Sequence, residues 1–405
     1  MNYYLFENCR TTNFYPISVT RSIMDIRIGM DTFLDRFKKL VSSDDKISIF
    51  VRNEIADLVR GKHSELEVNP QNINEGIWLA GHIFWNKHML EKLNSGEESS
   101  WLIKDEVVGF KLSEQSGKLW MEMGGPVESN FPGHFNQNEI TGQKASYLWD
   151  ILERIPKTLS EEINKSKSVF NKKTHLDSFH IVGEENIYIS DSAIVEPTVV
   201  INAEKGPVKI MENTLVQSLT YLEGPLIIGQ GTTVKPHTYV SSSVIGPVCK
   251  VGGEISKSIF QGYSNKVHDG HLGNSFLGEW VNLGAGTTNS NLKNNYSDVY
   301  INLDRQKINT GSPFIGSFIG DHVKTGIGTQ MNTGSVFGPC SSIVSSGLSP
   351  LNVKPFSWIV NGNQNLYQFD KFIETAQKVM QRRNRKLSRH EISYFKQLVS
   401  QNRFS

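Results

Sequence analysis

Residues 210–240 read IMENTLVQSLTYLEGPLIIGQGTTVKPHTYV, and an aliphatic residue recurs at every sixth position of this stretch. The recurring residues are Ile210, Val216, Leu222, Ile228, Val234 and Val240. An α-helix needs apolar residues every three or four positions, and an ordinary β-sandwich alternates with a period of two. A six-residue period instead predicts a parallel β-helix, in which short strands joined by tight turns stack and the recurring aliphatic residue fills the interior.

The same period extends to both sides of this stretch. Upstream, its further members are Ile189, Val195 and Ile201, with a short slip around residues 204–206 before Ile210. Downstream, Leu277 and Leu283 are six apart, and the same spacing runs from Ile319 through Thr325, Met331, Phe337 and Ile343. Of the 34 glycines in the chain, 22 lie between residues 180 and 355, where tight turns need small residues. We therefore predict that the β-helix occupies residues 181–360.

The chain before the β-helix alternates between strand-like and helix-like segments. Residues 3–6 and 47–51 are predicted strands, and residues 20–40 and 147–165 are predicted amphipathic helices. This alternation predicts an α/β domain over residues 1–180. Residues 94–142 are rich in Gly, Ser, Asn and charge, so we expect them to form surface loops.

The last part of the chain, residues 361–405, returns to helical spacing. Two helices are predicted, and Ser388 with Glu391 forms a capping box at the start of the second. Residues 366–405 carry nine Lys or Arg against three acids. This excess is typical either of an RNA-binding tail or of the solvated face of helices packed on a neighbouring domain. Because no aromatic stacking pattern accompanies it, we favour the packed helices.

Composition bounds the kinds of partner. The chain has 405 residues, enough for two or three domains, and a net charge of +1, which argues against nucleic-acid and membrane-surface binding. Cys9, Cys249 and Cys340 lie far apart, so neither a disulfide framework nor a thiolate metal site is indicated. No export signal or run of 18 apolar residues is present, and we expect a cytoplasmic protein with small-molecule partners.

Polar residues interrupt the six-residue period between residues 264 and 291. Residues 264–273 read SNKVHDGHLG, and NLGAGT follows at residues 282–287. A β-helix has little reason to place such residues in consecutive turns unless they project into a cleft. Imidazole is the side chain best suited to take a proton near neutral pH, so His268 or His271 is the candidate general base.

These motifs resemble a known family. Lys266-Val267-His268 stands before Asn282-Leu283-Gly284-Ala285-Gly286-Thr287 at the spacing found in the bifunctional bacterial enzymes that acetylate glucosamine 1-phosphate and uridylylate the product (the GlmU-type family). The sequence is most similar to an alternative branch described as sugar nucleotidyltransferases. The resemblance implies a left-handed β-helix, a homotrimer, and acetyl-CoA held between neighbouring β-helices.

The resemblance also implies roles for single residues. His268 would be the general base. Asn282, Asn291 and Lys257 would contact the sugar phosphate, with Lys235 and His271 as further candidates, and Gly284 and Ala285 would meet acetyl-CoA. The chain departs from the family at three positions: Leu292 and His271 replace aromatic residues, and Ile327 stands at the position of a serine that contacts the coenzyme.

The N-terminal domain lacks the Gly-rich phosphate loop of ordinary sugar nucleotidyltransferases. Instead, residues 20–29 read TRSIMDIRIG and resemble the Thr-Arg-Pro-x-x-Asp-Ile-Arg-x-Gly element of the alternative branch. Arg21 and Arg27 are candidates to clamp a nucleoside triphosphate such as UTP, with Asp25 beside Mg²⁺. The alternative is that Arg21 and Asp25 form an exposed pair one helical turn apart. Residues 78–82 either line the floor of the nucleotide-binding cleft of this domain or form a plain buried strand.

The sequence thus predicts a two-part transferase in UDP-N-acetylglucosamine biosynthesis, which serves the cell envelope. Three alternatives remain. In the first, the enzyme acylates another amino sugar and its N-terminal domain only binds nucleotide. In the second, the chain is a non-catalytic scaffold or regulatory subunit. The third is a zinc carbonic anhydrase using His237, His268 and His271, whose last pair is too closely spaced for that family.

Overall fold

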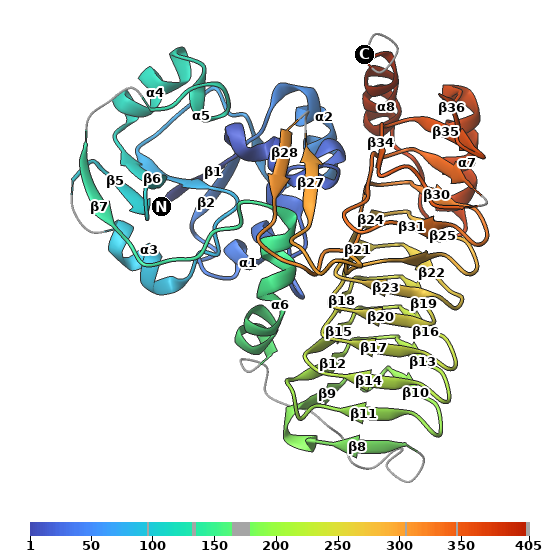
Figure 1. Cartoon of the computed structure of the whole chain (residues 1–405). Coiled ribbons are helices and arrows are strands. Elements are labelled where there is room, and N and C mark those ends of the chain that lie inside the picture. The colour runs from blue at the N-terminus through green and yellow to red at the C-terminus, as the bar shows by residue number, and fades with distance from the viewer. Residues whose placement is uncertain (95–96, 132–134, 164–178, 304–305, 346, 402–405) are drawn as a thin grey trace.

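The computed structural model describes residues 1–94, 97–131, 135–163, 179–303, 306–345 and 347–401. An α/β domain stands beside a tall coil of short strands, and two helices cover one end of that coil (Figure 1). Within the described residues, no helix is both long and apolar enough to cross a membrane.

The α/β domain is built on a seven-stranded sheet with the order β3-β2-β1-β4-β6-β5-β7. Its strands are β1 (Asn2–Phe6), β2 (Lys46–Phe50), β3 (Glu67–Val68), β4 (Gly76–Ala80), β5 (Ser99–Ile103), β6 (Glu106–Leu112) and β7 (Asn136–Glu139). Strands β1 to β4 run parallel, and β6 is antiparallel to β4. Trp78 anchors the core, since its ring stacks 4.5 Å from Tyr4 and 5.0 Å from Phe50.

Six α-helices and three short 3₁₀ turns surround this sheet. The helices are α1 (Phe33–Lys38), α2 (Asn53–Lys62), α3 (Lys87–Asn94), α4 (Glu114–Glu122), α5 (Gly125–Glu128) and α6 (Leu148–Ile163), and the 3₁₀ turns are η1 (Cys9–Phe14), η2 (Ile17–Thr20) and η3 (Ile23–Asp25). Helix α6 matches the helix predicted over 147–165.

Two predictions for this domain were wrong. Residues 94–142 contain β5, β6, β7, α4 and α5, and Trp101, Phe110 and Trp120 of this segment are buried. The polar residues that suggested surface loops occupy the turns and the solvent-facing sides of these elements. Residues 20–40 do not form one helix. The side chain of Ser22 accepts a hydrogen bond from Met24 N and closes a single short turn, and the capping box of Thr32 and Asp35 starts helix α1 only at Phe33.

The coil has three walls of stacked parallel strands. The ten-strand wall contains β10 (Ile194–Val195), β13 (Leu215–Val216), β16 (Thr233–Val234), β19 (Lys250–Val251), β22 (Asn265–Lys266), β25 (Asn282–Leu283), β30 (Lys324–Thr325), β33 (Ser342–Val344), β35 (Ser357–Val360) and the antiparallel β36 (Asn363–Leu366). The six-strand wall contains β8 (His180–Val182), β11 (Val200–Asn202), β14 (Tyr221–Glu223), β17 (Tyr239–Ser241), β20 (Glu254–Ser256) and β23 (His271–Gly273).

The nine-strand wall contains β9 (Ile187–Ile189), β12 (Val208–Ile210), β15 (Leu226–Ile228), β18 (Val244–Ile245), β21 (Ile259–Gly262), β24 (Phe276–Glu279), β29 (Phe318–Ile319), β32 (Val336–Phe337) and β34 (Asn352–Val353). The turn η4 (Glu184–Asn186) precedes β9, β26 (Thr288–Asn289) pairs with β31 (Gln330–Met331), and β27 (Tyr300–Leu303) forms a hairpin with β28 (Gln306–Asn309).

The six-residue period does mark the interior of this left-handed β-helix, as predicted. The members from Val195 to Ile343 are buried, and Ile189 is partly buried against the same core. Lys266 is a charged residue at an interior position. Lys266 pairs with Val251 on one side and Leu283 on the other, so its side chain occupies a place that aliphatic residues fill elsewhere.

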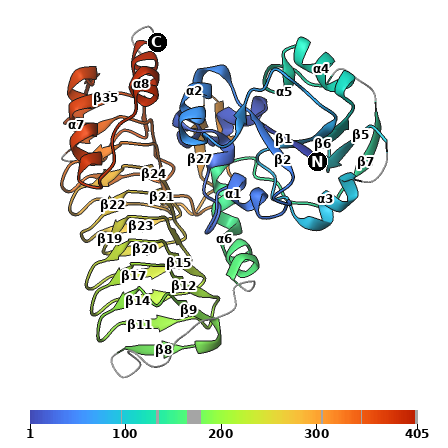
Figure 2. The same ribbon diagram turned by 180° about the vertical axis from the view of Figure 1, so that it is seen from behind.

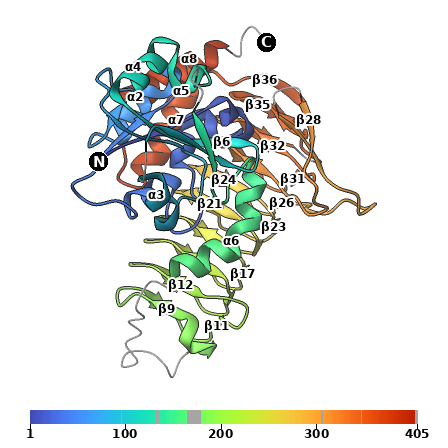
Figure 3. The ribbon, with the colours of Figure 1, turned by 90° about the vertical axis from the view of Figure 1, so that its left-hand side faces the viewer.

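The nine-strand wall joins the coil to the α/β domain. Its outward residues belong to the core of that domain; they are Ile227, Val244, Ile259, Phe276, Phe318 and Val336. Helix α6 runs along this wall (Figure 3), where Trp149 meets Phe318 with ring centroids 6.0 Å apart. The two parts therefore share one apolar core.

The two predicted C-terminal helices are α7 (Phe369–Gln381) and α8 (Arg389–Gln401). The capping box is confirmed, since Glu391 N donates to Ser388 Oγ and Ser388 N to the Glu391 carboxylate. Helix α8 packs against α2 of the α/β domain (Figure 2). The helices are therefore packed on both other parts of the molecule.

Candidate active sites

The first candidate site is the corner where the chain passes from the ten-strand wall to the six-strand wall, which we call the ten/six corner. It consists of residues 235–238, 252–253, 267–270, 284–287 and 326–329 of successive coils. His268 lies in its middle and is exposed. No hydrogen bond or ion pair engages the His268 ring within the described parts of the chain, so the ring faces outward and away from the apolar interior.

Lys266 holds the turn that carries His268. Its side chain is 1% exposed, and Nζ donates to the carbonyl oxygens of Gly252 (2.9 Å), His268 (2.8 Å) and Asp269 (3.1 Å). Burial lowers the pKa of Lys266 to about 8. An interior amine thus fixes the backbone on which the candidate base stands, an arrangement that the repeat pattern alone did not indicate.

Four other predicted residues share the ten/six corner with His268: Lys235, Gly284, Ala285 and Ile327. Gly284 stacks so closely on Gly326 that an added Cβ would lie 2.5 Å from the Gly326 oxygen. The N–H of Ala285 has no acceptor among the described residues, whereas the Ala285 oxygen accepts from Gly328 N at 2.7 Å. Ile327 is 84% exposed. The corner therefore offers a free amide and an apolar side chain, which fit a thioester ligand with an extended tail.

The remaining predicted residues of this site lie on the neighbouring walls. His271 is on the six-strand wall, with Nδ1 3.3 Å from a Glu254 oxygen. Asn291 Nδ2 donates to Asn274 Oδ1 at 2.8 Å, and an added Cβ at Gly273 would touch both Asn291 and the His271 ring. His271 and Asn291 therefore lie side by side.

Asn282 and Lys257 do not join that pair. Asn282 is on the ten-strand wall, where its Oδ1 accepts from Asn265 Nδ2 at 3.2 Å. Lys257 lies at a different corner, between the six-strand and nine-strand walls, and its Nζ bonds Glu153 of helix α6 at 2.7 Å. Within one chain, the two residues thus flank the His268 corner from separate sides.

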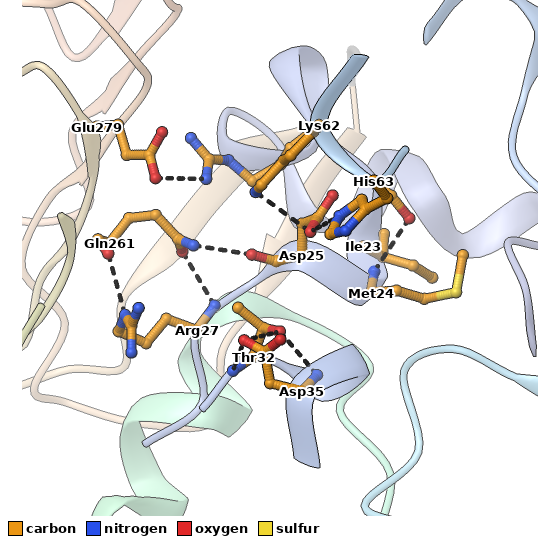
Figure 4. Close-up of polar contacts among 12 residues, drawn as sticks. Ile23, Met24, Asp25, Arg27, Thr32, Asp35, Lys62, His63, Gln261 and Glu279 are labelled. Carbon is orange, nitrogen blue, oxygen red and sulfur yellow. Dashed lines mark hydrogen bonds and ion pairs between the residues drawn. The ribbon is translucent and has the colours of Figure 1, made fainter. Parts of the chain in front are cut away.

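The second candidate site contains the residues predicted to hold a nucleotide (Figure 4). Arg21 is 4% exposed, and its NH2 donates to Asp321 of the coil at 2.5 Å. Arg27 Nε donates to the Gln261 oxygen at 3.0 Å, and NH1 donates to the Met30 oxygen. The structure therefore places both arginines against the β-helix.

Asp25 lies next to these arginines but pairs with other residues. Its carboxylate is 2.7 Å from His63 Nε2 and 3.2 Å from Lys62 Nζ (Figure 4). Burial opposes the charge, but Lys62 and His63 hold the pKa of Asp25 well below its ordinary value. The exposed pair of Arg21 and Asp25 on one helix, which we considered as an alternative, does not form, because the segment is not helical.

Arg21, Asp25 and Lys62 line a pocket of about 410 Å³ between the three parts of the chain. Trp280 and His322 of the coil and Phe395 of helix α8 form its other sides. Two nitrogens of Arg21, Nε and NH1, are buried without a hydrogen-bond partner among the described residues. The pocket therefore has donors available for an anionic ligand, but Asp321 and Glu279 already surround the same guanidinium.

A cleft of about 530 Å³ at the end of β1 was not predicted. Glu106 lines it, accepts from His82 Nε2 at 3.1 Å and from Lys144 Nζ, and forms an ion pair with Arg10 Nε at 2.8 Å. Burial works against the charge of Glu106, but His82, Lys144 and Arg10 lower its pKa to about 2. In the sheet, β1 has β2 on one side and β4 on the other, so the strand order reverses at β1. The cleft lies at this point of reversal, which is the usual place for ligands of open α/β sheets.

One sequence signal pointed to this cleft. Arg10 lies in the 3₁₀ turn η1 shortly after β1, where ordinary nucleotidyltransferases carry their phosphate loop, but Glu106 and Lys144, the other charges of the cluster, are distant in the sequence. Of residues 78–82, Trp78 is a core residue and buried His82 reaches Glu106.

The described residues contain no group of three His, Cys, Asp or Glu side chains placed to hold a metal ion. Asp25 is a single carboxylate already paired with two cations, which does not fit a Mg²⁺ site that needs several oxygen ligands. His237, His268 and His271 are likewise not gathered into a zinc site.

Comparisons with known proteins agree with the expected resemblance. Residues 3–168 match a family model described as "Sugar nucleotidyl transferase". Over 142 residues the chain is 34% identical to the bifunctional sugar-1-phosphate nucleotidylyltransferase/acetyltransferase of Sulfurisphaera tokodaii, a match covering 34% of this chain and 35% of that protein. Over 240 residues it is 22% identical to the bifunctional protein GlmU of Synechococcus elongatus, covering 49% and 53%.

The chain thus spans between about a third and about a half of the length of these curated relatives. Among solved structures, a UDP-N-acetylglucosamine acyltransferase from Campylobacter jejuni aligns with 11% identity over 51% of this chain and 94% of that chain, with a TM-score of 0.15. The fold assignment rests instead on the three stacked walls of the coil.

Proposed function

We propose that the chain transfers an acetyl group from acetyl-CoA to an amino-sugar 1-phosphate at the ten/six corner, with His268 as general base. The observation that carries this proposal is the exposed, unengaged imidazole of His268, held on a turn by buried Lys266, next to the free N–H of Ala285. The sequence relatives named as bifunctional nucleotidylyltransferase/acetyltransferase support the same activity.

In the proposed reaction, acetyl-CoA supplies the thioester carbonyl that the sugar amine attacks. The neutral His268 ring removes the proton of the attacking amine and can return it to the departing sulfur, a role typically worth about 10²–10⁴-fold in rate. The Ala285 N–H would stabilise the carbonyl oxygen as charge develops on it. Ile327 and the small residues around Gly284 would contact the coenzyme.

We propose glucosamine 1-phosphate as the acceptor, contacted by Asn282, Asn291, Lys235 and Lys257. Because Asn282 and Lys257 flank the corner from separate sides of one chain, a neighbouring chain would bring the full set together, and we propose a homotrimer. His271 at a position that is aromatic in the resembling family favours a second candidate, acylation of a different amino sugar by the same base.

For the N-terminal domain, we propose binding of a nucleotide such as UTP and of the sugar 1-phosphate, followed by nucleotidyl transfer. The position of the cleft around Arg10 and Glu106 favours it as the ligand site. The pocket at Arg21 and Asp25, approached by Arg27, is the competing location. Pyrophosphate release with UTP and N-acetylglucosamine 1-phosphate, compared between Arg10→Gln and Arg21→Gln, tells the two apart. Release unchanged in both would exclude both clefts as the reaction site, and no release in the wild type would leave a domain that binds without catalysis.

The experiment that tests the acetyl transfer follows free thiol released from acetyl-CoA with glucosamine 1-phosphate. His268→Gln should lower the rate about 10²–10⁴-fold with an unchanged melting temperature, because the ring has no partner among the described residues. His180→Gln is the matched control, because His180 is an exposed histidine of β8 on the six-strand wall and belongs to neither candidate site. No thiol release with any amino-sugar phosphate would contradict the proposal and favour a scaffold. We also propose that the protein works in the cytoplasm, where both substrates are made.

A further inference from the structure

Four cations gather on the ten-strand wall beside the His268 corner: Lys235, Lys250, Arg382 and Arg383. Lys250 lies opposite Asn265 in the register of β19 and β22, and Asn265 lies opposite Asn282 in the next strand. Arg383, just beyond helix α7, reaches this ladder, because its NH2 donates to Asn265 Oδ1 at 3.1 Å. The end of a C-terminal helix thus meets the face that carries Asn282.

Lys235 links these cations to the corner itself. A Cβ built at Gly252 would lie 3.4 Å from Lys235 Cβ and 2.0 Å from the oxygen of Val267, the residue before His268. Gly252 is therefore sandwiched between the coil of Lys235 and the coil of His268. One coil separates the cation from the candidate base on the same corner.

The cations have no carboxylate partner within the described residues. Lys235 Nζ donates to the neutral Gln217 Oε1 at 2.7 Å, and Arg383 donates to an amide. Burial lowers the pKa of Lys250, and the positive charges of Arg383, Arg382 and Lys235 lower it further, so these three cations lie within electrostatic reach of Lys250. Glu196 acts electrostatically on Lys235, but none of the four cations forms an ion pair with a carboxylate within the described residues. Like charges gathered in this way form a site for an anion.

We propose that Lys235, Lys250, Arg382 and Arg383 form a phosphate platform that binds a phosphate group of an acyl-transfer substrate. The inference rests on the proposed function and adds Lys250 and the two arginines of the C-terminal segment, a role for the basic run that the sequence left open. The planar arginine forks suit phosphate oxygens, and the lysines act as point charges. The phosphate belongs either to the sugar 1-phosphate or to the coenzyme.

The first test measures binding without turnover. Inorganic pyrophosphate is titrated calorimetrically into the full chain at low salt. Arg382→Gln/Arg383→Gln and Lys250→Gln should each weaken its binding about tenfold or more, as expected for lost charge-assisted contacts. The control is Lys378→Gln, because Lys378 lies on helix α7 but is paired with Glu374 at 2.6 Å. Equal pyrophosphate binding in wild type and variants, or none in wild type, would overturn the proposal.

The second test identifies the source of the phosphate. KM is compared for glucosamine 1-phosphate against glucosamine, and for acetyl-CoA against acetyl-pantetheine, which lacks the coenzyme phosphates. If KM in the arginine double variant rises only for glucosamine 1-phosphate or only for acetyl-CoA, the result supports the platform and identifies the phosphate that it binds. An equal rise for both members of each pair would overturn it. If the chain acetylates no amino sugar, the proposed function fails and pyrophosphate binding alone decides the platform.

Discussion

Arg21 of the α/β domain and Asp321 of the coil are 300 residues apart in the sequence, yet the guanidinium donates to the carboxylate at 2.5 Å. The same carboxylate accepts from Thr20 Oγ1 at 2.6 Å and from Glu279 N at 2.7 Å. Asp321 is therefore a polar centre of the contact between the two parts, beside the apolar residues of the nine-strand wall.

This contact predicts a large effect on stability. Asp321→Ala should lower the free energy of unfolding by about 3–5 kcal/mol, because it leaves the Arg21 charge buried without its partner. Glu153→Gln is the matched control, since its pair with Lys257 also joins the two parts but both side chains are partly exposed. That change should cost about 1 kcal/mol or less. Urea denaturation of both variants checks the prediction, and similar losses would contradict it.

Buried Lys266 predicts stability that rises with pH. The folded chain releases the proton of Lys266 at a pKa of about 8, whereas the unfolded chain keeps it up to the ordinary 10.5. Unfolding therefore takes up a proton between these values, and raising the pH stabilises the fold. Lys266→Met should reduce this slope in melting temperatures measured from pH 7 to 10.5.

Because Lys266 also holds the carbonyl oxygens of His268 and Asp269, Lys266→Met should in addition lower acetyl transfer while leaving His268 in place. Lys378→Met on the exposed face of α7 controls for loss of a surface lysine. If the pH dependence of the melting temperature were the same in Lys266→Met and wild type, burial would not lower the pKa of Lys266 in the folded chain, and the prediction would be wrong.

Buried His322 predicts a loss of folding stability at acid pH. Burial among Trp280, Phe372 and Phe395 lowers the pKa of His322 to about 3, from an ordinary 6.5. Between these values the unfolded chain binds a proton that the folded chain does not, so stability falls as the pH falls from 6.5 to 3. His322→Phe should flatten this fall and keep the ring contacts.

His322→Gln separates the two effects of this residue. It also removes the titration, but it loses the ring contacts with the C-terminal helices, so it should be less stable than His322→Phe at every pH. Thermal melts between pH 3 and 7 measure both variants. An acid slope equal to that of the wild type in both would show that another group controls acid unfolding.

The cleft at Arg10 predicts opposite effects of its two charges on nucleotide binding. Arg10→Gln should weaken UTP binding about tenfold or more, because a charge-assisted contact with phosphate is lost. Glu106→Gln should strengthen it, because Arg10 and Lys144 no longer share a carboxylate. Fluorescence titration with a labelled UTP analogue checks both, and weaker binding in Glu106→Gln would contradict the assignment.

The coil was predictable because its signal is local. Each aliphatic residue from Val195 to Ile343 occupies an interior place fixed by its distance from the previous one, without reference to the rest of the fold. His268 was placed outside for the same reason, since it falls in a turn of the period. Lys266 was not interpreted as an interior residue, because a lysine at that place is stable only with the three carbonyl oxygens that fold around it.

The polar contacts between distant segments were not predictable. Arg21 was expected to meet a nucleotide, but its partner Asp321 is set by how the α/β domain packs on the coil. The cleft of Arg10, Glu106 and Lys144 likewise joins three segments that one sequence cannot align. The buried strands of residues 94–142 were missed because their apolar residues are diluted by charged turns.

The shared apolar core along the nine-strand wall has a further consequence. Since Ile227, Phe276 and Phe318 are buried by the other part of the same chain, separating the halves would expose a ladder of aliphatic and aromatic residues to water. The halves therefore cannot swing to hand a product from one site to the other. Under the proposed function, a sugar that reacts at both sites would therefore leave the protein, diffuse through the surrounding solution and be captured again.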